Sequence, residues 1–124
     1  MRRRGYDAER ALVRKLRSLG FKAVRVPSSA PSSEPLPDLF GTLNEGVLAV
    51  EVKASSGDKI YFSSSQVKKL FEFLEMFDLY REKVALLVGK FPYRWIFKRV
   101  EKVDNYVLRR DEKSNIQLEE IFKG

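Results

Sequence analysis

Hydrophobic and polar residues alternate most regularly over residues 47–53 (Val-Leu-Ala-Val-Glu-Val-Lys). In a β-strand, alternate residues face opposite sides of the sheet. One of the two faces therefore carries Val47 and Ala49, followed by the charged pair Glu51 and Lys53. Charged groups on an otherwise apolar face cost free energy unless a ligand or partner neutralises them. This strand is the first candidate for a functional site.

A second strand is expected to begin at Asp38 and to pair with the first. Residues 41–46 (Gly-Thr-Leu-Asn-Glu-Gly) have the composition of a turn, so a hairpin is predicted. Asp38 and Glu51 would then meet at the open end of this hairpin, with Lys53 about 6.6 Å further along the strand. Two acids and a lysine can bind a divalent cation and activate water for phosphodiester hydrolysis. The alternative is an exposed edge whose charges discourage strand addition.

Residues 6–19 show the spacing of an amphipathic helix that ends before Gly20. Leu12 and Leu16 mark its apolar face, and Glu9 lies within the same arc at about 100° per residue. Glu9 is therefore predicted to point toward the core. It would serve either as a third acidic ligand for the same cation or as a partner for the N-terminus of its own helix.

The remaining pattern predicts further strands at 21–26, 60–62, 84–88, 93–100 and 106–108, a helix from 63 to about 77 with a capping box, and a final helix over 116–122 capped by Ser114. Residues 27–37 are rich in Pro and Ser and are predicted to form a mobile loop. The order of these elements indicates an α/β domain, with a central mixed β-sheet flanked by helices. One domain is expected over 1–124, with the loop at 27–37 as a functional flap.

The composition narrows the chemistry. The 124 residues include neither Cys nor His, which excludes disulfides, thiolate catalysis, Cys/His zinc sites and a histidine general base. Any metal would have oxygen ligands, so Mg²⁺ or Mn²⁺ is expected. No Gly-rich phosphate loop is present, so no nucleotide cofactor is predicted. The chain has no signal peptide and no apolar run long enough to span a membrane, so a cytoplasmic, nucleoid-associated location is expected.

The net charge of +7 is concentrated at the start of the chain. Residues 1–25 hold nine Lys or Arg against two acids, while the remainder is balanced. Such a block indicates a polyanionic partner, most simply nucleic acid, although a solvated basic helix is the alternative. The candidate DNA contacts are Arg2, Arg3, Arg4, Arg10, Arg14 and Arg25.

With these residues in place, the chain resembles the PD-(D/E)xK nuclease superfamily and, within it, the archaeal Holliday junction resolvases of the Hjc and Hje type. The resemblance runs from Gly5 to about Phe122. It is carried by a set of short motifs: GYDAER at 5–10, GF at 20–21, AVR at 23–25, PSS at 27–29, PLPD at 35–38, EVK at 51–53, QVKKL at 66–70, FL at 73–74 and MF at 76–77.

The resemblance implies a restriction-endonuclease-like fold and a homodimeric Holliday junction resolvase. Such an enzyme makes paired, symmetric nicks in four-way DNA junctions during homologous recombination and DNA repair, and leaves 5′-phosphates. The implied site comprises Glu9, Asp38 and Glu51 as ligands of Mg²⁺ (or Mn²⁺) with the Val52 backbone carbonyl, Lys53 as the active-site lysine, and Ser29 as the loop serine. Ser28 and Ser32 are alternatives for that serine.

Two other functions compete with this interpretation. One is a nuclease of the same superfamily that cuts duplex DNA, such as a mismatch or restriction-type enzyme. The other is a catalytically silent DNA-binding dimer that recruits repair proteins, against which the intact acids and lysine argue. An RNA-binding module lacks the basic and aromatic interleaving of an RRM. A sliding clamp or recombination proteins are candidate partners, although residues 117–122 match a clamp-binding motif poorly.

Overall fold

The computed structural model describes residues 2–27 and 33–122, with side chains from residue 6 onward. The elements in chain order are α1 (Arg2–Ser18), β1 (Lys22–Arg25), β2 (Leu39–Leu43), β3 (Gly46–Ala54), β4 (Lys59–Phe62), α2 (Ser64–Leu74), β5 (Glu82–Phe91), β6 (Arg94–Val100), β7 (Tyr106–Arg109) and a 3₁₀ turn (Leu118–Glu120). The predicted strands and the first two helices are therefore confirmed, with shifts at their ends.

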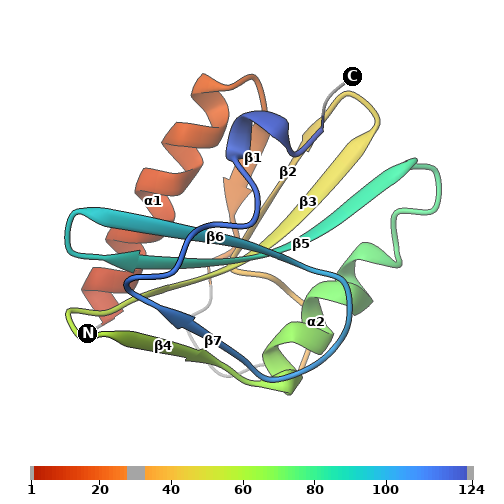
Figure 1. Ribbon diagram of the computed structural model, residues 1–124. Helices are drawn as coiled ribbons and strands as arrows, with labels where there is room; N and C mark the ends of the chain where they lie inside the picture. The colour runs from red at the N-terminus through yellow and green to blue at the C-terminus, as the bar shows by residue number, and fades with distance from the viewer. Residues whose placement is uncertain (1, 28–32, 123–124) are drawn as a thin grey trace.

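A five-stranded sheet forms the centre of the molecule, in the order β1-β2-β3-β5-β6. The β3 and β5 strands are parallel and the other neighbours are antiparallel, so the predicted mixed sheet is confirmed. The helices α1 and α2 lie on opposite faces of this sheet (Figure 1). A separate antiparallel pair, β4 and β7, lies beside α2.

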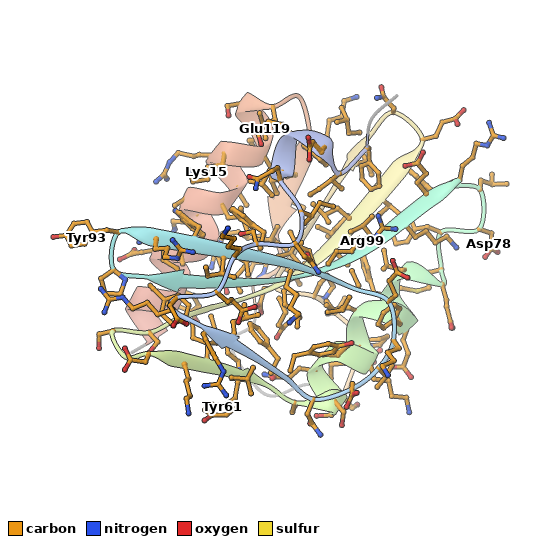
Figure 2. All side chains as sticks on the ribbon, viewed as in Figure 1. Lys15, Tyr61, Asp78, Tyr93, Arg99 and Glu119 are labelled. Atoms are coloured by element: carbon orange, nitrogen blue, oxygen red, sulfur yellow. The ribbon has the colours of Figure 1, made fainter. Side chains whose placement is uncertain are left out.

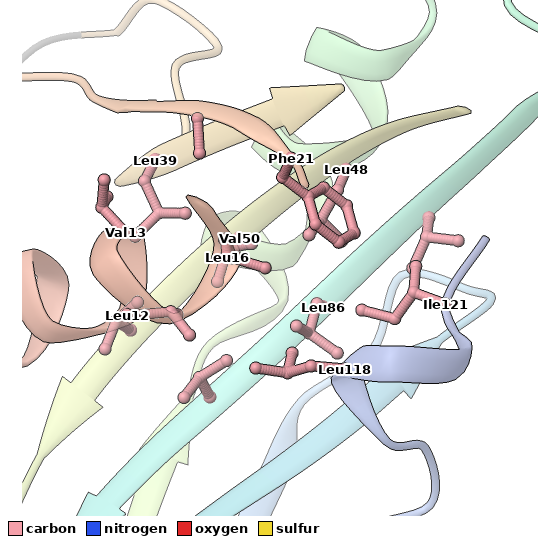
Figure 3. Packing of buried hydrophobic residues seen from close by; sticks show 14 of the residues in the cluster. Leu12, Val13, Leu16, Phe21, Leu39, Leu48, Val50, Leu86, Leu118 and Ile121 are labelled. Atoms are coloured by element: carbon pink, nitrogen blue, oxygen red, sulfur yellow. The ribbon is translucent and has the colours of Figure 1, made fainter. Parts of the chain in front are cut away.

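The alternation in β3 divides the hydrophobic core in two. Val50 and its even-numbered neighbours pack toward α1, where Figure 3 shows Leu12 and Leu16 of that helix beside them. Val47 and Ala49 pack into the second cluster, under α2. By the same alternation, the charged pair at the end of β3 belongs to the α2 face.

Local signals in the sequence set the helix ends. Gly20 has a φ of 99° and follows the last turn of α1, as predicted for a C-terminal glycine. At the start of α2, the Ser63 hydroxyl accepts from the Gln66 N–H at 3.3 Å and the Gln66 side chain accepts from the Ser63 N–H at 3.0 Å. The predicted capping box is thus confirmed, although α2 ends at Leu74. Among the described residues, no helix has both the length and the apolar composition needed to cross a bilayer.

The predicted final helix over 116–122 is wrong. Only the 3₁₀ turn at Leu118–Glu120 is present. Ser114 does not cap a helix; its hydroxyl accepts from the Phe97 N–H at 2.8 Å, and Asn115 bonds both backbone groups of Arg99 at 2.8 and 3.1 Å. These bonds fasten the segment along the outer edge of β6. The side chains of Ser114 and Asn115 therefore bond the backbone of β6, whereas the sequence pattern predicts that Ser114 caps a helix.

Candidate active site

The open end of the β2–β3 hairpin brings the two predicted acids together. Leu39 is paired with Val50, so Asp38 lies beside the first residue of β3 that extends past β2. The Asp38 N–H donates to the Val50 carbonyl at 3.0 Å, and the Asp38 carboxylate accepts from the Val52 N–H at 2.8 Å. Asp38 thereby bonds the edge of β3 that β2 no longer covers beyond Val50, while the other edge stays paired with β5.

The same bond defines the direction of the Val52 backbone. In a regular strand, the N–H and C=O of one residue point toward the same edge. Because the Val52 N–H points to the Asp38 carboxylate, the Val52 carbonyl also faces that edge. Two oxygen-bearing groups, the Asp38 carboxylate and this carbonyl, therefore lie at the open end of the hairpin.

The two acids occupy an environment that opposes their ionisation. Burial and the neighbouring Asp38 carboxylate outweigh Lys53 and raise the pKa of Glu51 to about 8, with Glu9 adding to the effect and Lys69 opposing it. Burial also raises the pKa of Asp38, against the opposing effects of the Val52 N–H, Lys53 and Arg25. Half-buried carboxylates that repel each other are typical of sites that receive a cation or a proton.

Lys53 extends the site along β3. Its ammonium group donates to the Tyr61 carbonyl at 2.6 Å and lies 5.2 Å from the centre of the Phe62 ring. These contacts with β4 hold the lysine beside both acids, whose pKa values it lowers. A surface hollow of about 700 Å³ adjoins it, lined by β4, β7 and the N-terminus of α2. Figure 2 shows Tyr61 projecting from the edge of this region.

Glu9 is buried, as its position on the α1 wheel predicts, and is 8% exposed. Burial and the charge of Asp38 raise its pKa, whereas Arg25 and Arg10 lower it. Its carboxylate accepts from the Arg25 Nε at 3.1 Å. The alternative in which Glu9 bonds its own helix N-terminus is wrong, because α1 begins at Arg2 and Glu9 lies two turns into the helix.

The donor set at the hairpin end fits a hard divalent cation. Within residues 2–27 and 33–122, no three acidic side chains already converge closely enough to chelate one ion. Asp38 and Glu51 repel each other, Asp38 raises the pKa of Glu9, and Glu9 raises the pKa of Glu51, so the three acids act on one another electrostatically. Carboxylate and carbonyl oxygens are the ligands that Mg²⁺ and Mn²⁺ prefer, and a bound cation would relieve the repulsion within the pair.

Several predicted site residues lie outside the described part of the chain. These are Ser29 with its alternatives Ser28 and Ser32, and the side chains of Arg2, Arg3 and Arg4. Among the described arginines, Arg10 and Arg14 are exposed on α1, and Arg10 lies 3.7 Å from Asp7. Arg25 differs from both, since it points inward and is ion-paired with Glu9.

Two residues near the site were missed by the sequence analysis. Lys69 on α2, the helix that covers the Glu51 face of β3, lowers the pKa of Glu51. Its helical spacing from the buried Phe73 marks it as partly inward, but only tertiary packing brings it near Glu51. Tyr6 on α1 lies against the guanidinium groups of Arg10 and Arg25, at 6.0 and 5.3 Å from the ring centre.

Comparison with known proteins shows which proteins the chain resembles. The family model described as "Archaeal holliday junction resolvase (hjc)" matches residues 1–124. A "Crossover junction endodeoxyribonuclease Hje" of Saccharolobus islandicus is 38% identical over 119 residues, which cover 96% of this chain and 87% of the relative. A "Crossover junction endodeoxyribonuclease Hjc" of Archaeoglobus fulgidus is 34% identical over 121 residues, covering 97% and 82%. The solved structure of Archaeoglobus fulgidus Hjc, titled a Holliday junction resolvase from an archaeal hyperthermophile, superposes with a TM-score of 0.71 at 28% identity, over 86% of this chain and 88% of that one.

Proposed function

The chain belongs to the archaeal Holliday junction resolvase (Hjc) family, and from this premise we propose that it is a metal-dependent endonuclease that resolves four-way DNA junctions. The observation that carries the proposal is the meeting of Asp38, Glu51 and Lys53 at the open end of the β2–β3 hairpin. Two mutually repelling carboxylates beside an ammonium group suit phosphodiester hydrolysis. The fold and the relatives supply the substrate class, and the hairpin end supplies the chemistry.

Asp38, Glu51 and the Val52 carbonyl would hold the cation, with Mg²⁺ as the expected ion and Mn²⁺ as a substitute. Glu9 would complete or orient its surroundings. When bound, such a cation supplies Lewis-acid activation of water and neutralises charge at the scissile phosphate. Lys53 orients the attacking water and stabilises the negative charge that develops on the phosphoryl oxygens. Ser29 would bond the phosphate once DNA is in place.

The products follow from the direction of attack. Water adds to phosphorus, the bond from phosphorus to the 3′-oxygen breaks, and a 3′-hydroxyl leaves. The new 5′ end keeps the phosphate. Basic residues of α1, including the exposed Arg10 and Arg14, would contact the DNA backbone. Affinity should then fall steeply with salt and depend little on sequence.

A homodimer would carry two such sites on one basic face, which suits the cutting of two opposed strands. Selectivity for junctions would come from the shape of the DNA across both subunits. The cell would use this activity in homologous recombination and DNA repair, at the nucleoid. A sliding clamp or recombination proteins remain candidate partners.

The deciding experiment uses an immobile four-way junction and a linear duplex of matched sequence, each labelled at one strand end. Both are incubated with the protein in Mg²⁺, in Mn²⁺ or in EDTA, and the products are resolved on a denaturing gel. Paired symmetric nicks in the junction alone, dependent on the cation and ending in 5′-phosphates, are the expected result. Equal cutting of the duplex would identify a general nuclease, and tight binding without cutting a recruiting module. Either outcome overturns the proposal.

A further inference from the structure

We propose that Arg25 is a positioning residue that fixes the Glu9 carboxylate beside the cation site, and that it does not contact DNA. The inference rests on the proposed function, because it concerns the surroundings of the proposed cation site. It departs from the sequence-based expectation that Arg25 belongs with the DNA-binding arginines.

The backbone turns the Arg25 side chain away from solvent. Arg25 is the last residue of β1, and it shares a strand face with Ala23, which is buried in the core under α1. Its side chain therefore runs beneath α1, which lies beside β1 (Figure 1). The Arg25 side chain is only 22% exposed, and the side chain of its partner Glu9, counted without the backbone, is 11% exposed. Arg25 therefore offers a DNA phosphate far less access than the exposed Arg10 and Arg14 do.

Two contacts fix the orientation of the guanidinium. The Nε of Arg25 donates to the Oε1 of Glu9 at 3.1 Å. The central carbon of the group lies over the Tyr6 ring, 5.3 Å from the ring centre. A planar cation can stack and donate at the same time, whereas the point charge of a lysine cannot reproduce both contacts. The arrangement thus specifies arginine.

Removing the charge of Arg25 should change cation binding in opposite directions, depending on whether Arg25 acts by its charge alone or by positioning Glu9. Arg25 stabilises the ionised forms of both Glu9 and Asp38, lowering the pKa of each. If its positive charge were its only effect, removing it would tighten the binding of a cation at Asp38 and Glu51. If it positions Glu9, removing it leaves a buried carboxylate unpaired and misplaced, and cation binding weakens.

The first test measures Mn²⁺ binding to the DNA-free, full-length protein by calorimetry and by electron paramagnetic resonance of the free ion. Arg25→Gln and Arg25→Lys are compared with Arg14→Gln, which alters an exposed arginine on the polar face of α1. Both Arg25 variants should bind Mn²⁺ about 10–100-fold more weakly, as expected when an outer partner of a metal site is lost. Arg14→Gln should bind it as the unsubstituted protein does. Tyr6→Leu, which removes the stacking surface, should show a smaller loss in the same direction.

The second test measures the salt dependence of junction binding in EDTA. A phosphate contact contributes about one unit to the slope of log affinity against log salt. Arg14→Gln should lower the slope by about that amount, and the Arg25 variants should leave it unchanged. Circular dichroism checks that each variant is folded; if Arg25→Gln unfolds, Arg25→Lys carries both measurements.

The inference is overturned if Arg25→Lys restores Mn²⁺ affinity, if Arg25→Gln tightens it, or if the Arg25 variants lower the salt slope with metal binding intact. Those results leave the proposed function standing as long as the unsubstituted protein binds Mn²⁺ and cuts junctions. If the unsubstituted protein neither binds Mn²⁺ nor cuts junctions, the proposed function is wrong, and this inference, which depends on it, is wrong as well.

Discussion

The two ends of the β2–β3 hairpin contrast two uses of the same pair of strands. At the closed end, Asn44 takes the left-handed φ of 55° that a tight turn requires, and Gly46 packs directly under the Phe122 ring. At the open end, Asp38 and Glu51 lie half-buried with raised pKa values. The closed end satisfies local preferences, whereas the open end keeps carboxylates in an environment that disfavours their charge. The comparison indicates that the closed end contributes to stability. The open end keeps an unfavourable electrostatic environment, as expected of a functional site.

The largest effect is expected at the open end. Asp38→Asn should reduce junction cleavage by about 10²-fold or more, because the change removes one charged oxygen ligand of the cation and several kcal/mol of charge stabilisation. The melting temperature should stay the same or rise, since Asn can still accept from the Val52 N–H and no longer repels Glu51. Cleavage is followed on a denaturing gel and unfolding by circular dichroism. Intact cleavage in Mg²⁺ would contradict the assignment of Asp38.

Stability should depend on pH through Glu51. Its folded pKa of about 8 lies above the ordinary value of 4.5, so the folded state holds a proton that the unfolded chain releases. This contribution is fully present below about pH 4.5 and is lost as the pH rises through about 8, a change on the order of 5 kcal/mol.

Thermal unfolding in EDTA between pH 5 and pH 9 measures this loss. Glu51→Gln should flatten the decline, because glutamine has no proton to release. Divalent cations should also reverse it, since they bind the ionised form. A melting temperature that does not change with pH in the unsubstituted protein would refute the raised pKa.

At the closed end, Gly46→Ala should lower stability without a specific effect on catalysis. The added Cβ would lie 2.5 Å from atoms of the Phe122 ring. Relief of that overlap should cost about 1–3 kcal/mol. The control is Gly57→Ala, where the nearest atom to the added Cβ is the Ser55 hydroxyl at 3.4 Å. Denaturant unfolding should show a loss for Gly46→Ala alone, while both variants cut junctions normally well below their melting temperatures.

The smallest effect concerns the surface of the closed end. Glu45 and Arg81 form an ion pair of 3.4 Å whose side chains are 67% and 77% exposed. Because water and salt screen such pairs, Glu45→Gln should change the free energy of unfolding by less than about 0.5 kcal/mol. A loss above 1 kcal/mol in denaturant titrations would show that the closed end depends on this charge as well as on its packing.

The site was predictable from the sequence to the extent that it depends on local patterns. Period-two alternation and the predicted hairpin bring Asp38 beside Glu51, although the turn is shorter than the expected 41–46 and occupies only positions 44–45. The α1 wheel turns Glu9 inward. The partners of these acids were not predictable in this way. Lys69 acts on Glu51 from α2, which covers the face of β3 that carries Glu51, and Arg25 acts on Glu9 from an edge strand. Neither pairing has a signature in sequence spacing.

The C-terminal segment shows that prediction of the fold has the same limit, because its structure depends on contacts with distant residues. Residues 114–122 carry a cap residue and apolar spacing, and by themselves they favour a helix. In the structure, Ser114 and Asn115 bond the open edge of β6, and Phe122 covers Gly46. A short helix is marginal in isolation, so an unpaired strand edge competes successfully for its polar groups.

The sequence by itself determined the strands, the presence of the hairpin, the capped helix and the identity of the charged residues, because each depends on neighbours within a few positions. Only the tertiary structure decided which charges face one another, how far burial raises their pKa values, and that Arg25 points beneath α1 and away from solvent. Burial and long-range pairing depend on residues far apart along the chain. Their energies are set when α1, the sheet and α2 pack together.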